Sequence, residues 1–462
     1  MAWLNLEQQR SAQRISLSTM RWSAGLLLVL LVTVMTWGGV SWAPYERLEA
    51  DYVDGLAQWT VAQSAGQVPE SRLAVIDIDE ASLDAFGPWP WPRHLTAQLI
   101  REAKERYHAP AVGVDIVFPD TYGEKQEKTL QQALSLPGVV LAQAFDVNAV
   151  GEPPKTASLA GGFTRAALPP GKLGEHLKVA TGYVGNMDQL VAQLSKISGV
   201  RDEPAACVGH ITPQPAKDGV VRHIAPVIAY QDRVYPMLTL TMLRCSKLQL
   251  EGYRLALNQQ GSWQIPWTKA LSSYTVVSAK DVLTRQVAPQ LLDQRYLLIG
   301  SSALGIGDRV ATPLAPVMPG VMVHAQVLSY LLDQAPVLMT ERNVSPALPL
   351  ELLRDSPQQQ NVIAWVYSLG LALGIALFLW HLNLVWALTW AALGSLAWLL
   401  ITMYLYRLHA STAWILPWVT VLLVMFFYVP LEWAIAQAQN RLVMRRLGAY
   451  LAPDVLRRLL AE

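Results

Sequence analysis

Charged residues are scarce in this sequence. Asp, Glu, Lys and Arg together make up 15% of the 462 residues, whereas 52% are hydrophobic, so a wholly soluble protein is not expected. The 36 basic and 35 acidic residues nearly cancel and leave a net charge of +1. A chain this close to neutral has neither the basic face that binds nucleic acid nor an acidic tail. Nucleic acid is therefore not expected as a partner.

Four long runs contain no Asp, Glu, Lys or Arg at all. Each run is long enough to cross about 30 Å of hydrocarbon as a helix. We predict four transmembrane helices, at residues 22–43, 361–380, 382–406 and 410–431. Trp and Tyr are concentrated at the ends of these runs, where an amphipathic ring suits the lipid headgroup layer. The lipid bilayer is an expected partner.

The first run also fits a second interpretation, a signal peptide cleaved after the Ser-Trp-Ala of residues 41–43. Signal peptides have an apolar stretch of roughly 7 to 15 residues, and this run is longer, so we expect an uncleaved anchor. Basic residues lie before the first run and after the last: Arg10, Arg14, Arg21, Arg441, Arg445 and Arg446. The positive-inside rule then predicts that both termini are cytoplasmic and that residues 44–360 are not.

Cysteine is nearly absent, with only Cys207 and Cys245 in the chain. Both fall in the block that we expect outside the cytoplasm, where disulfides form. A bond between them would close a loop worth roughly 4 kcal/mol by the chain-entropy estimate. Two ordinary buried thiols fit the sequence equally well.

Strand and helix patterns alternate within the external block. Apolar runs predict strands at residues 73–79, 111–118, 138–145 and 295–302, and helical spacing predicts helices at 80–86, 94–108, 129–136 and 323–334. A strand, helix, strand order implies a right-handed crossover and a parallel sheet. Residues 253–267, with an Asn-Gln-Gln-Gly turn, predict an antiparallel hairpin. The expected fold is an α/β domain at residues 44–335, with a mainly parallel sheet and antiparallel additions, joined by a linker at 336–360 to the later membrane helices.

Ionisable residues gather where the predicted parallel strands end, which is where open α/β sheets bind ligands. Asp77 and Asp79 close the first strand, Asp115 lies in the second, and the loop 300–313 follows the last. Carboxylates close together raise each other's pKa unless a cation joins them. The candidate cations are Arg93, Arg222 and Arg309.

One enzymatic interpretation rests on Asp77 and Asp79. An apolar strand followed by Asp-x-Asp is how haloacid-dehalogenase-type phosphatases present a nucleophile and a general acid. Ala81 stands where that pattern has Thr or Val, and no later Lys with paired acidic residues follows in the right context. The alternative is structural, because Asp79 can cap a helix that begins at Glu80, with Asp77 on the same strand face.

Recognised metal and phosphate motifs are missing. His210 and His324 have no partner at a known metal-ligand spacing, so we expect polar histidines with satisfied hydrogen bonds and no metal. The glycines of residues 300–308 lack the Lys and Ser/Thr of a phosphate-binding loop and indicate a turn-forming loop. No cofactor is expected.

Several ordered motifs together resemble the CHASE domain of the second type, a sensory extracellular module of bacterial cyclases, kinases and phosphodiesterases. They are VIDIDEASLDAFGPWPWPRHLTAQLI, AVGVDIVFPD, GHITPQPAKDGVVRHIAPV and RYLLIGSSALGIGDRVATPLAPVMPGVMVHAQVLSYLL, preceded by ERLEADYVD. The resemblance covers roughly residues 44–335 and extends through the three C-terminal membrane helices. It implies a receptor of the bacterial inner membrane with a periplasmic sensor domain, whose signal is a small molecule or a protein.

The family pattern falls on residues spread over the whole block: Asp77, Asp79, Ser82, Trp89, Trp91, Arg93, Asp115, Asp218, Gly219, Arg222, Gly300, Asp308, Pro313, Gly320, His324 and Ala325. The candidate ligand-binding residues among them are Asp77, Asp79, Trp89, Trp91, Arg93, Asp115, Arg222, Asp308 and His324. Three prolines make the Gly-Pro-Trp-Pro-Trp-Pro-Arg loop rigid. Its indoles either wall a ligand pocket, with Arg93 answering an anion, or simply cover the end of the sheet.

The C-terminal segment 432–462 carries a one-sided apolar stripe, and its last part resembles the linker that leads into class III adenylate or guanylate cyclase domains. None of the metal-binding or nucleotide-reading residues of such a cyclase is present, so we expect no enzymatic activity from this chain. The leading hypothesis is a homodimeric sensor with its output in a further domain or a partner protein. The alternatives are the phosphatase that uses Asp77 and Asp79, and a membrane scaffold that binds another protein.

Overall fold

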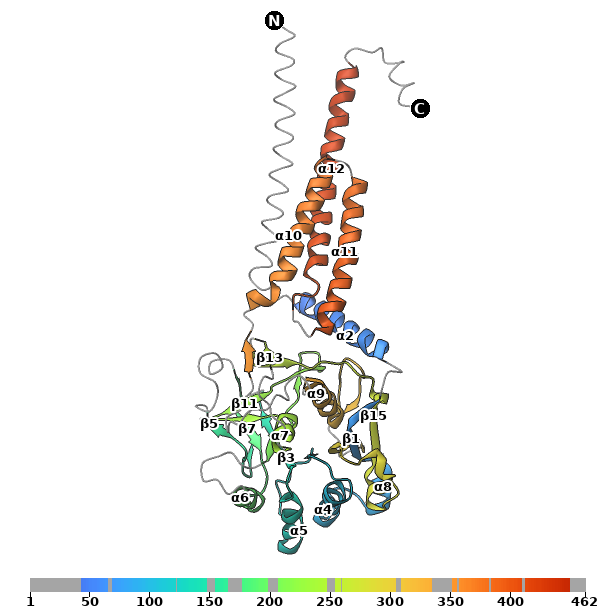
Figure 1. Cartoon of the computed structure of the whole chain (residues 1–462). Coiled ribbons are helices and arrows are strands. Elements are labelled where there is room, and N and C mark those ends of the chain that lie inside the picture. The colour runs from blue at the N-terminus through green and yellow to red at the C-terminus, as the bar shows by residue number, and fades with distance from the viewer. Residues whose placement is uncertain are drawn as a thin grey trace, which may run out of the picture. The chain divides into compact units, whose positions relative to one another are not determined.

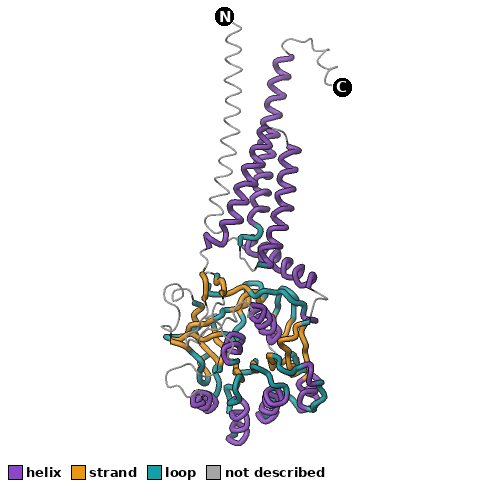
Figure 2. The backbone as a smooth tube through the Cα atoms, in the orientation of Figure 1, coloured by secondary structure: helices purple, strands orange, loops and turns teal. Residues whose placement is uncertain are grey.

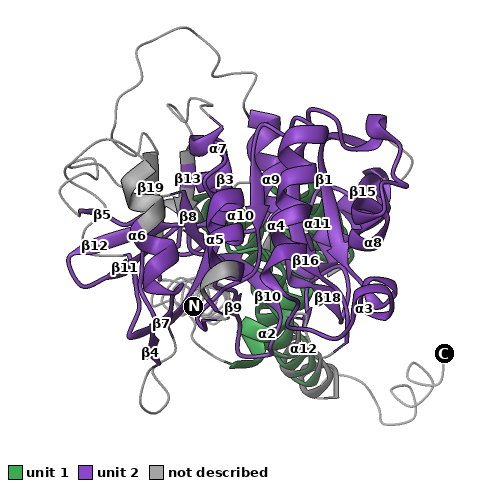
Figure 3. Ribbon diagram, turned by 90° about the horizontal axis from the view of Figure 1, so that it is seen from below, with its two compact units in different colours: residues 1–53, 358–462 green, residues 54–357 purple. Residues whose placement is uncertain are grey.

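A computed structural model gives the fold of the chain (Figure 1). It describes residues 43–64, 69–121, 123–147, 154–164, 177–197, 207–246, 254–258, 260–304, 309–334, 351–354, 357–381, 384–408 and 412–448. The chain forms two compact units (Figure 3). The smaller unit comprises residues 1–53 and 358–462, and the larger unit comprises residues 54–357.

An eight-stranded sheet organises the larger unit. Its strands run in the order β15 (Tyr274–Ser278), β1 (Glu70–Ile78), β16 (Tyr296–Ser301), β2 (Val112–Val114), β3 (Val139–Asp146), β7 (Gly182–Val184) and β4 (Lys155–Thr156), with β8 (Val208–His210) also paired to β3. Among these described pairings only β3 with β7 is antiparallel. The predicted mainly parallel α/β sheet is confirmed.

Strand β2 is shorter than the sequence predicted. The apolar run 111–118 indicates a long strand, yet the strand ends at Val114. Beyond it, the amide of Phe118 donates to the side-chain oxygen of Asn186 at 2.9 Å. At Phe118 a side chain, in place of a neighbouring strand, thus takes the backbone hydrogen bond.

Helices cover both faces of the sheet (Figure 1). One face carries α3 (Glu80–Phe86), α4 (Arg93–Arg101), which continues as a π-helical turn at Glu102–Arg106, α5 (Glu124–Leu134) and α8 (Ala279–Leu283). The other face carries α7 (Leu238–Cys245) and α9 (Gly320–Gln334). Glycine allows this second layer to approach closely, because a Cβ at Gly113 or Gly300 would meet Met242 or Val321 at 2.5 Å.

Three smaller sheets extend the larger unit, whose helices and strands Figure 2 distinguishes by colour. The first contains β19 (Glu351–Arg354), β13 (Arg254–Leu257), β14 (Trp263–Gln264), β10 (Val221–Ile224) and β9 (Gln214–Pro215). The second contains β5 (Phe163–Thr164), β12 (Arg233–Pro236), β11 (Val227–Tyr230) and β6 (Lys178–Val179), and the third pairs β17 (Arg309–Val310) with β18 (Met318–Pro319). The remaining helices are α6 (Asp188–Ile197) and two 3₁₀ turns, Leu271–Ser273 and Pro289–Leu291.

The first of these sheets tests two of the sequence predictions. β13 and β14 form the predicted antiparallel hairpin, and the positive φ of Gly261 (72°) closes its turn. The predicted linker 336–360 needs a correction, because it contains β19, which pairs in parallel with β13. Residues 335–350 lie outside the described residues.

Cys207 and Cys245 form a disulfide, which selects one of the two alternatives that the sequence left open. The bond joins the start of β8 to the end of α7. A buried glycine brings these elements together as well, since a Cβ at Gly209 would meet the backbone of Leu238 at 2.6 Å. The disulfide therefore holds α7 on the sheet.

We predict that replacing both cysteines by serine lowers the free energy of unfolding by about 4 kcal/mol, because the bond spans 38 residues. Urea unfolding of the full chain, followed by Trp fluorescence, measures the loss. Dithiothreitol should destabilise the wild-type chain and leave the double variant unchanged. Equal unfolding midpoints for the wild type and the double variant would contradict this role.

The smaller unit contains α10 (Pro357–His381), α11 (Leu384–Arg407), α12 (Leu416–Gly448) and the first part of α2 (Ala43–Ser64). Among the described residues two helices are long and apolar enough to cross a membrane, at residues 361–378 and 385–407. The apolar part of α12 is shorter, at residues 416–427, and the predicted first span falls almost wholly outside the described residues. The structure thus supports two of the four predicted spans.

Close packing holds α10 and α11 together. A Cβ at Gly374 would meet the indole of Trp390 at 2.2 Å, and one at Gly394 would meet Leu371 at 2.1 Å. The hydroxyl of Tyr367 also donates to the carbonyl oxygen of Gly394 at 2.7 Å. Small residues and interhelical hydrogen bonds of this kind are typical of helices that pack in lipid.

Candidate ligand-binding site

Asp77 holds the loop that follows β16 through two hydrogen bonds. Its carboxylate accepts the backbone N–H of Ser302 at 2.7 Å and the Ser302 hydroxyl at 2.5 Å. Burial, and to a smaller extent the nearby charges of Asp79 and Glu80, raise the pKa of Asp77 despite these hydrogen bonds. Glu80 contacts the same loop, since its Oε1 accepts the N–H of Leu304 at 3.0 Å.

Asp79 caps helix α3, as its position before Glu80 predicted. Its Oδ1 accepts the N–H of Ser82 at 2.9 Å and the hydroxyls of Ser82 and Ser278 at 2.6 and 2.8 Å. Burial acts to raise the pKa of Asp79, but these hydrogen bonds outweigh it and lower the pKa. The second carboxylate is therefore the one held ionised.

These directions are opposite to those that a phosphatase requires. The nucleophile at Asp77 should be ionised and the general acid at Asp79 should hold a proton. The structure raises the pKa of Asp77 and lowers that of Asp79. Both carboxylates are also engaged by serine side chains, so the geometry supports a structural role for the pair.

The two indoles of the Trp-Pro loop, Trp89 and Trp91, lie in different environments. Trp91 is only 1% exposed, its indole N–H donates to the carbonyl oxygen of Gly87 at 2.9 Å, and Phe86 packs against it edge to face. Trp91 is therefore part of the main hydrophobic core, and the proposed role as a pocket wall is wrong for this side chain. Trp89 is half-buried and packs against the same core. Both indoles of the loop therefore pack onto the main hydrophobic core.

Arg93 is buried and faces protein groups. Its guanidinium donates to the carbonyl oxygen of Asp120 at 3.0 Å and lies 4.5 Å from the ring centre of Phe118. Its backbone N–H donates to the side chain of Gln126 at 3.2 Å. Arg93 thus fixes the chain after β2, and this environment does not present it to an anion.

Arg222 is held between two carboxylates. Its guanidinium donates to both oxygens of Asp54 at 2.7 Å and to both oxygens of Asp218 at 2.8 and 3.0 Å. Burial acts to lower the pKa of Arg222, but these hydrogen bonds raise it above its ordinary range, and they hold the pKa of Asp218 below its own. With two carboxylates already bound, Arg222 is not an anion receptor.

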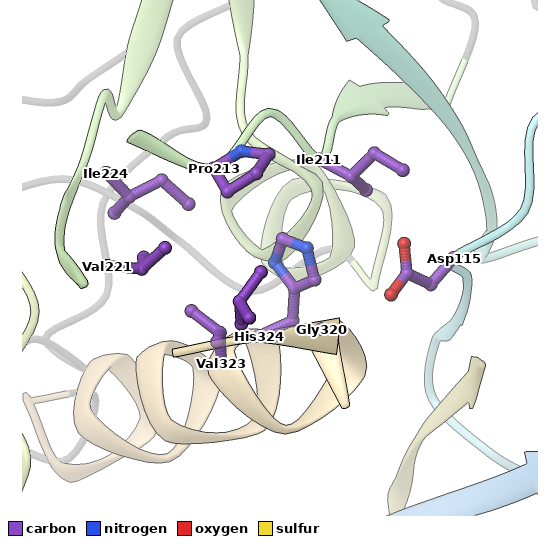
Figure 4. A pocket seen from close by; sticks show the side chains of 9 residues that line it. Asp115, Ile211, Pro213, Val221, Ile224, Gly320, Val323 and His324 are labelled. Carbon is purple, nitrogen blue, oxygen red and sulfur yellow. The ribbon is translucent and has the colours of Figure 1, made fainter. Parts of the chain in front are cut away.

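A cavity lies beside the end of β2 (Figure 4). Its wall is mostly aliphatic, with one carboxylate and one imidazole: Asp115, Ile211, Pro213, Val221, Ile224, Val310, Gly320, Val323 and His324. The space that water centres can reach is about 20 Å³, which is room for one or two water molecules. Asp115 and His324 are thus the two predicted ligand-binding residues that the structure brings together in a cavity.

Asp77 and Asp79 are not part of this cavity. The strand order places β16 between β1 and β2, so Asp77 and Asp115 are two strands apart, on the order of 10 Å. The predicted cluster of three carboxylates is therefore split into two places along the same sheet edge. Asp308, the remaining candidate, lies outside the described residues.

The sequence profile of the CHASE2 domain matches residues 27–404 of the chain. The chain belongs to the CHASE2 domain family. Members of this family are extracellular sensory domains of receptors such as cyclases and histidine kinases, so the chain carries a sensor domain. No curated protein and no solved structure matches the chain.

Sequence reasoning missed the contacts that α2 makes with later parts of the CHASE2 domain. Asp54 contacts Arg222, and the side-chain amide of Gln58 donates to the carbonyl oxygen of Pro313 at 2.9 Å. Asp54 and Arg222 are 168 residues apart in the chain, and no local pattern links them. The one available signal was that Asp54 and Gln58 are spaced by four, which places them on one helix face.

Burial keeps three histidines of the CHASE2 domain neutral. The prediction of satisfied hydrogen bonds is wrong for His324, because its buried Nδ1 has no partner among the described residues. Burial lowers the pKa of His324 to about 4, and together with the nearby His324 it lowers the pKa of His210 to about 3. Burial, with the adjacent charge of Arg222, lowers the pKa of His223 to about 4. No group of three or more His, Cys, Asp and Glu within the described ranges is arranged to hold a metal ion.

We predict that the domain loses stability as the pH falls below about 6.5. The unfolded histidines take up protons there, whereas the folded ones stay neutral down to about pH 4. Each such histidine adds a slope of about 1.4 kcal/mol per pH unit. Urea unfolding of the full chain at pH 4.5, 5.5 and 6.5 measures the slope.

The variant His324→Gln should reduce this slope by about 1.4 kcal/mol per pH unit, because one buried titrating group is gone. The matched control is His94→Gln, since His94 is exposed on α4 and its replacement should leave the slope unchanged. Acid-sensitive carboxylates such as Glu70 are present in all three proteins and cancel in the comparison. An unchanged slope in His324→Gln would show that this imidazole does not stay neutral.

Proposed function

We propose that this chain is a multi-pass receptor of a bacterial inner membrane, in which the CHASE2 domain lies in the periplasm and both termini are cytoplasmic. The family supports the sensory role, and two long apolar helices support the membrane location. The signal passes to a cytoplasmic output, for which the cyclase-like C-terminal segment suggests a nucleotide cyclase. The receptor acts as a homodimer, and this chain itself is not an enzyme.

The observation that carries the proposal is the set of polar contacts made by helix α2. In the larger unit, Asp54 binds Arg222, which follows the cavity residue Val221 directly in β10. In the same unit Gln58 binds the carbonyl oxygen of Pro313, three residues after the cavity residue Val310. One face of α2 therefore contacts two adjoining wall segments of the cavity, β10 and the segment after Val310.

Helix α2 also makes polar contacts within the smaller unit. The carboxylate of Glu49 accepts the backbone N–H of Trp414 at 2.8 Å, two residues before α12 begins, and Tyr52 and Thr402 share a hydrogen bond of 2.5 Å. Burial raises the pKa of Glu49 to about 7, although the hydrogen bond from Trp414 opposes that rise. Helix α2 (Ala43–Ser64) thus has residues in both units, with Glu49 and Tyr52 in the smaller unit and Asp54 in the larger unit.

This arrangement supplies what a two-state sensor needs. A ligand changes an equilibrium only by the difference between its affinities for the two states. A ligand that draws the cavity walls together shifts Arg222 or Pro313, and α2 follows because its side chains are bound to both. The buried pair at Asp54 makes this link stiff, since breaking a buried ion pair costs several kcal/mol.

We predict that Asp54→Asn changes the signalling state without unfolding the domain, because Asp218 still pairs with Arg222. A cysteine placed at Leu442 in α12 reports the state through the yield of crosslinked dimer in membranes. Asp54→Asn should change that yield at least twofold. The matched control is Asp51→Asn, an exposed carboxylate one turn earlier on the same helix. No crosslinked dimer, or equal yields in the two variants, would count against the receptor.

The proposed topology predicts which introduced cysteines a membrane-impermeant maleimide can reach in intact cells. Gln290→Cys, at an exposed position of the larger unit, should be labelled, and Leu442→Cys should be labelled only after permeabilisation. The native cysteines give no background because they form the disulfide. The reverse labelling pattern would place the CHASE2 domain in the cytoplasm and overturn the proposal.

A further inference from the structure

We infer that the cavity between the end of β2 and helix α9 binds a short neutral alcohol, of the size of methanol or ethanol. The inference deepens the proposed sensor function by naming the chemical class of its ligand, and it rests on that function only for its biological meaning. Three properties of the cavity carry it, namely an unpaired imidazole, an aliphatic wall and a small size.

A buried imidazole in the wall lacks a hydrogen-bond partner. Figure 4 shows the ring of His324 rising from α9 toward Pro213. The residue is only 4% exposed, and its Nδ1 has no partner among the described residues. An unpaired buried polar atom is unfavourable, so a ligand that pairs with it gains affinity. Asp115, the other polar residue of the wall, already has an interaction partner in the chain, so the open hydrogen-bonding position is that of His324.

A hydroxyl group suits this position in either form of the ring. Burial lowers the pKa of His324 to about 4, so the imidazole is neutral at pH 7. A neutral imidazole carries its proton on one of its two nitrogens, so Nδ1 either accepts or donates a hydrogen bond. A hydroxyl group does both, whereas a carbonyl or nitrile group only accepts. The hydroxyl of an alcohol therefore pairs with Nδ1 whichever nitrogen holds the proton.

The rest of the wall favours an alkyl group next to that hydroxyl. Most of the lining side chains are aliphatic: Ile211, Pro213, Val221, Ile224, Val310 and Val323. These side chains offer no hydrogen bond to water, whereas burial of one methylene group against them raises affinity roughly fourfold. A short alcohol displaces water from the cavity because it keeps the hydrogen bond to His324 and adds apolar contact.

The size of the cavity limits the length of the alcohol. Water centres reach about 20 Å³ of it, which is room for one or two water molecules, so a ligand of about two or three non-hydrogen atoms fits. Gly320 lies four residues before His324 on one face of α9 and has no side chain to fill the space beside the ring. Ile211, Pro213 and Val310 are half-buried, so the cavity lies near the surface and a small ligand enters without unfolding the domain.

The experiment measures binding to the full-length chain in detergent at pH 7.5 by saturation-transfer NMR. The probes are methanol, ethanol, acetonitrile and tert-butanol, and micelles without protein give the background. We expect saturable binding of ethanol with a Kd on the order of 1 mM, close to the limit for three non-hydrogen atoms. Methanol should bind roughly fourfold more weakly, because it has one methylene group less. Acetonitrile, which cannot donate, and tert-butanol, which is too large, should show no saturable binding.

Two variants with matched controls locate the site. His324→Phe keeps a ring but removes the hydrogen bond, so it should weaken ethanol binding about fivefold. The control His94→Phe, at an exposed position of α4, should leave binding unchanged. Val323→Ile adds one methylene group to the wall and should weaken binding at least tenfold. The control Val317→Ile adds the same group at a position that is 57% exposed and should have no effect.

Ethanol binding that does not saturate, equal affinities for ethanol and acetonitrile, or unchanged binding in either folded cavity variant would overturn the inference. The comparison of probes in the wild-type protein keeps the test valid if a cavity variant does not fold. A failure here with the Asp54→Asn effect on crosslinking intact would leave the receptor proposal standing. Failure of the crosslinking alone would leave the binding site standing.

Discussion

The parallel pairing of β15, β1, β16, β2 and β3 is the constraint on which the rest of this structure depends. Parallel strands bring their carboxyl ends to one edge, so residues far apart in the chain meet there. The edge collects Asp77, Asp79 and Asp115, and buried carboxylates are costly unless they receive hydrogen bonds. Ser278 at the end of β15, Ser302 after β16 and Ser82 in the first turn of α3 meet that cost for Asp77 and Asp79.

The same edge explains why the cavity can communicate with a distant helix. Its walls come from β10, from the segment at Val310 and from α9, which are held together mainly through the sheet and through α2. Val221 donates its backbone N–H to the carbonyl oxygen of Ala311 at 2.7 Å, so two of these walls move as one. Asp54 and Gln58 then bind those two walls from one helix face. The link from cavity to α2 is therefore short and polar.

Sequence reasoning placed the sheet well because each strand carries its own local signal. β1, β3 and β16 are apolar runs with β-branched residues, and the structure places their ends within three residues of the predicted ends. Helix α2 was missed, because the part of it that is buried is small: Leu56, Ala57 and Thr60. Such a short apolar stripe is weak beside the charged residues around it.

The site was harder to predict because a side chain's partner decides its role. Arg222 suited an anion by its chemistry, yet a carboxylate 168 residues away occupies it. Trp91 belonged to a rigid loop that could have faced either way, and only the packing against Phe86 shows that it faces the core. Asp115 was predicted from the strand-end rule and His324 from the family pattern. The structure places both in the wall of one cavity.

A buried imidazole next to a carboxylate is a poor way to stabilise a fold. Replacing both by apolar groups of similar shape would remove a desolvation cost of a few kcal/mol, so stability alone does not account for their presence. A ligand that donates a hydrogen bond to Nδ1 of His324 would recover part of that cost only when the walls are at the right separation. The free energy of binding then depends on the position of β10 and the Val310 segment, which α2 holds through Arg222 and Pro313. The unpaired Nδ1 of His324 in the free domain is thus what would let a ligand in this cavity bias the conformational equilibrium.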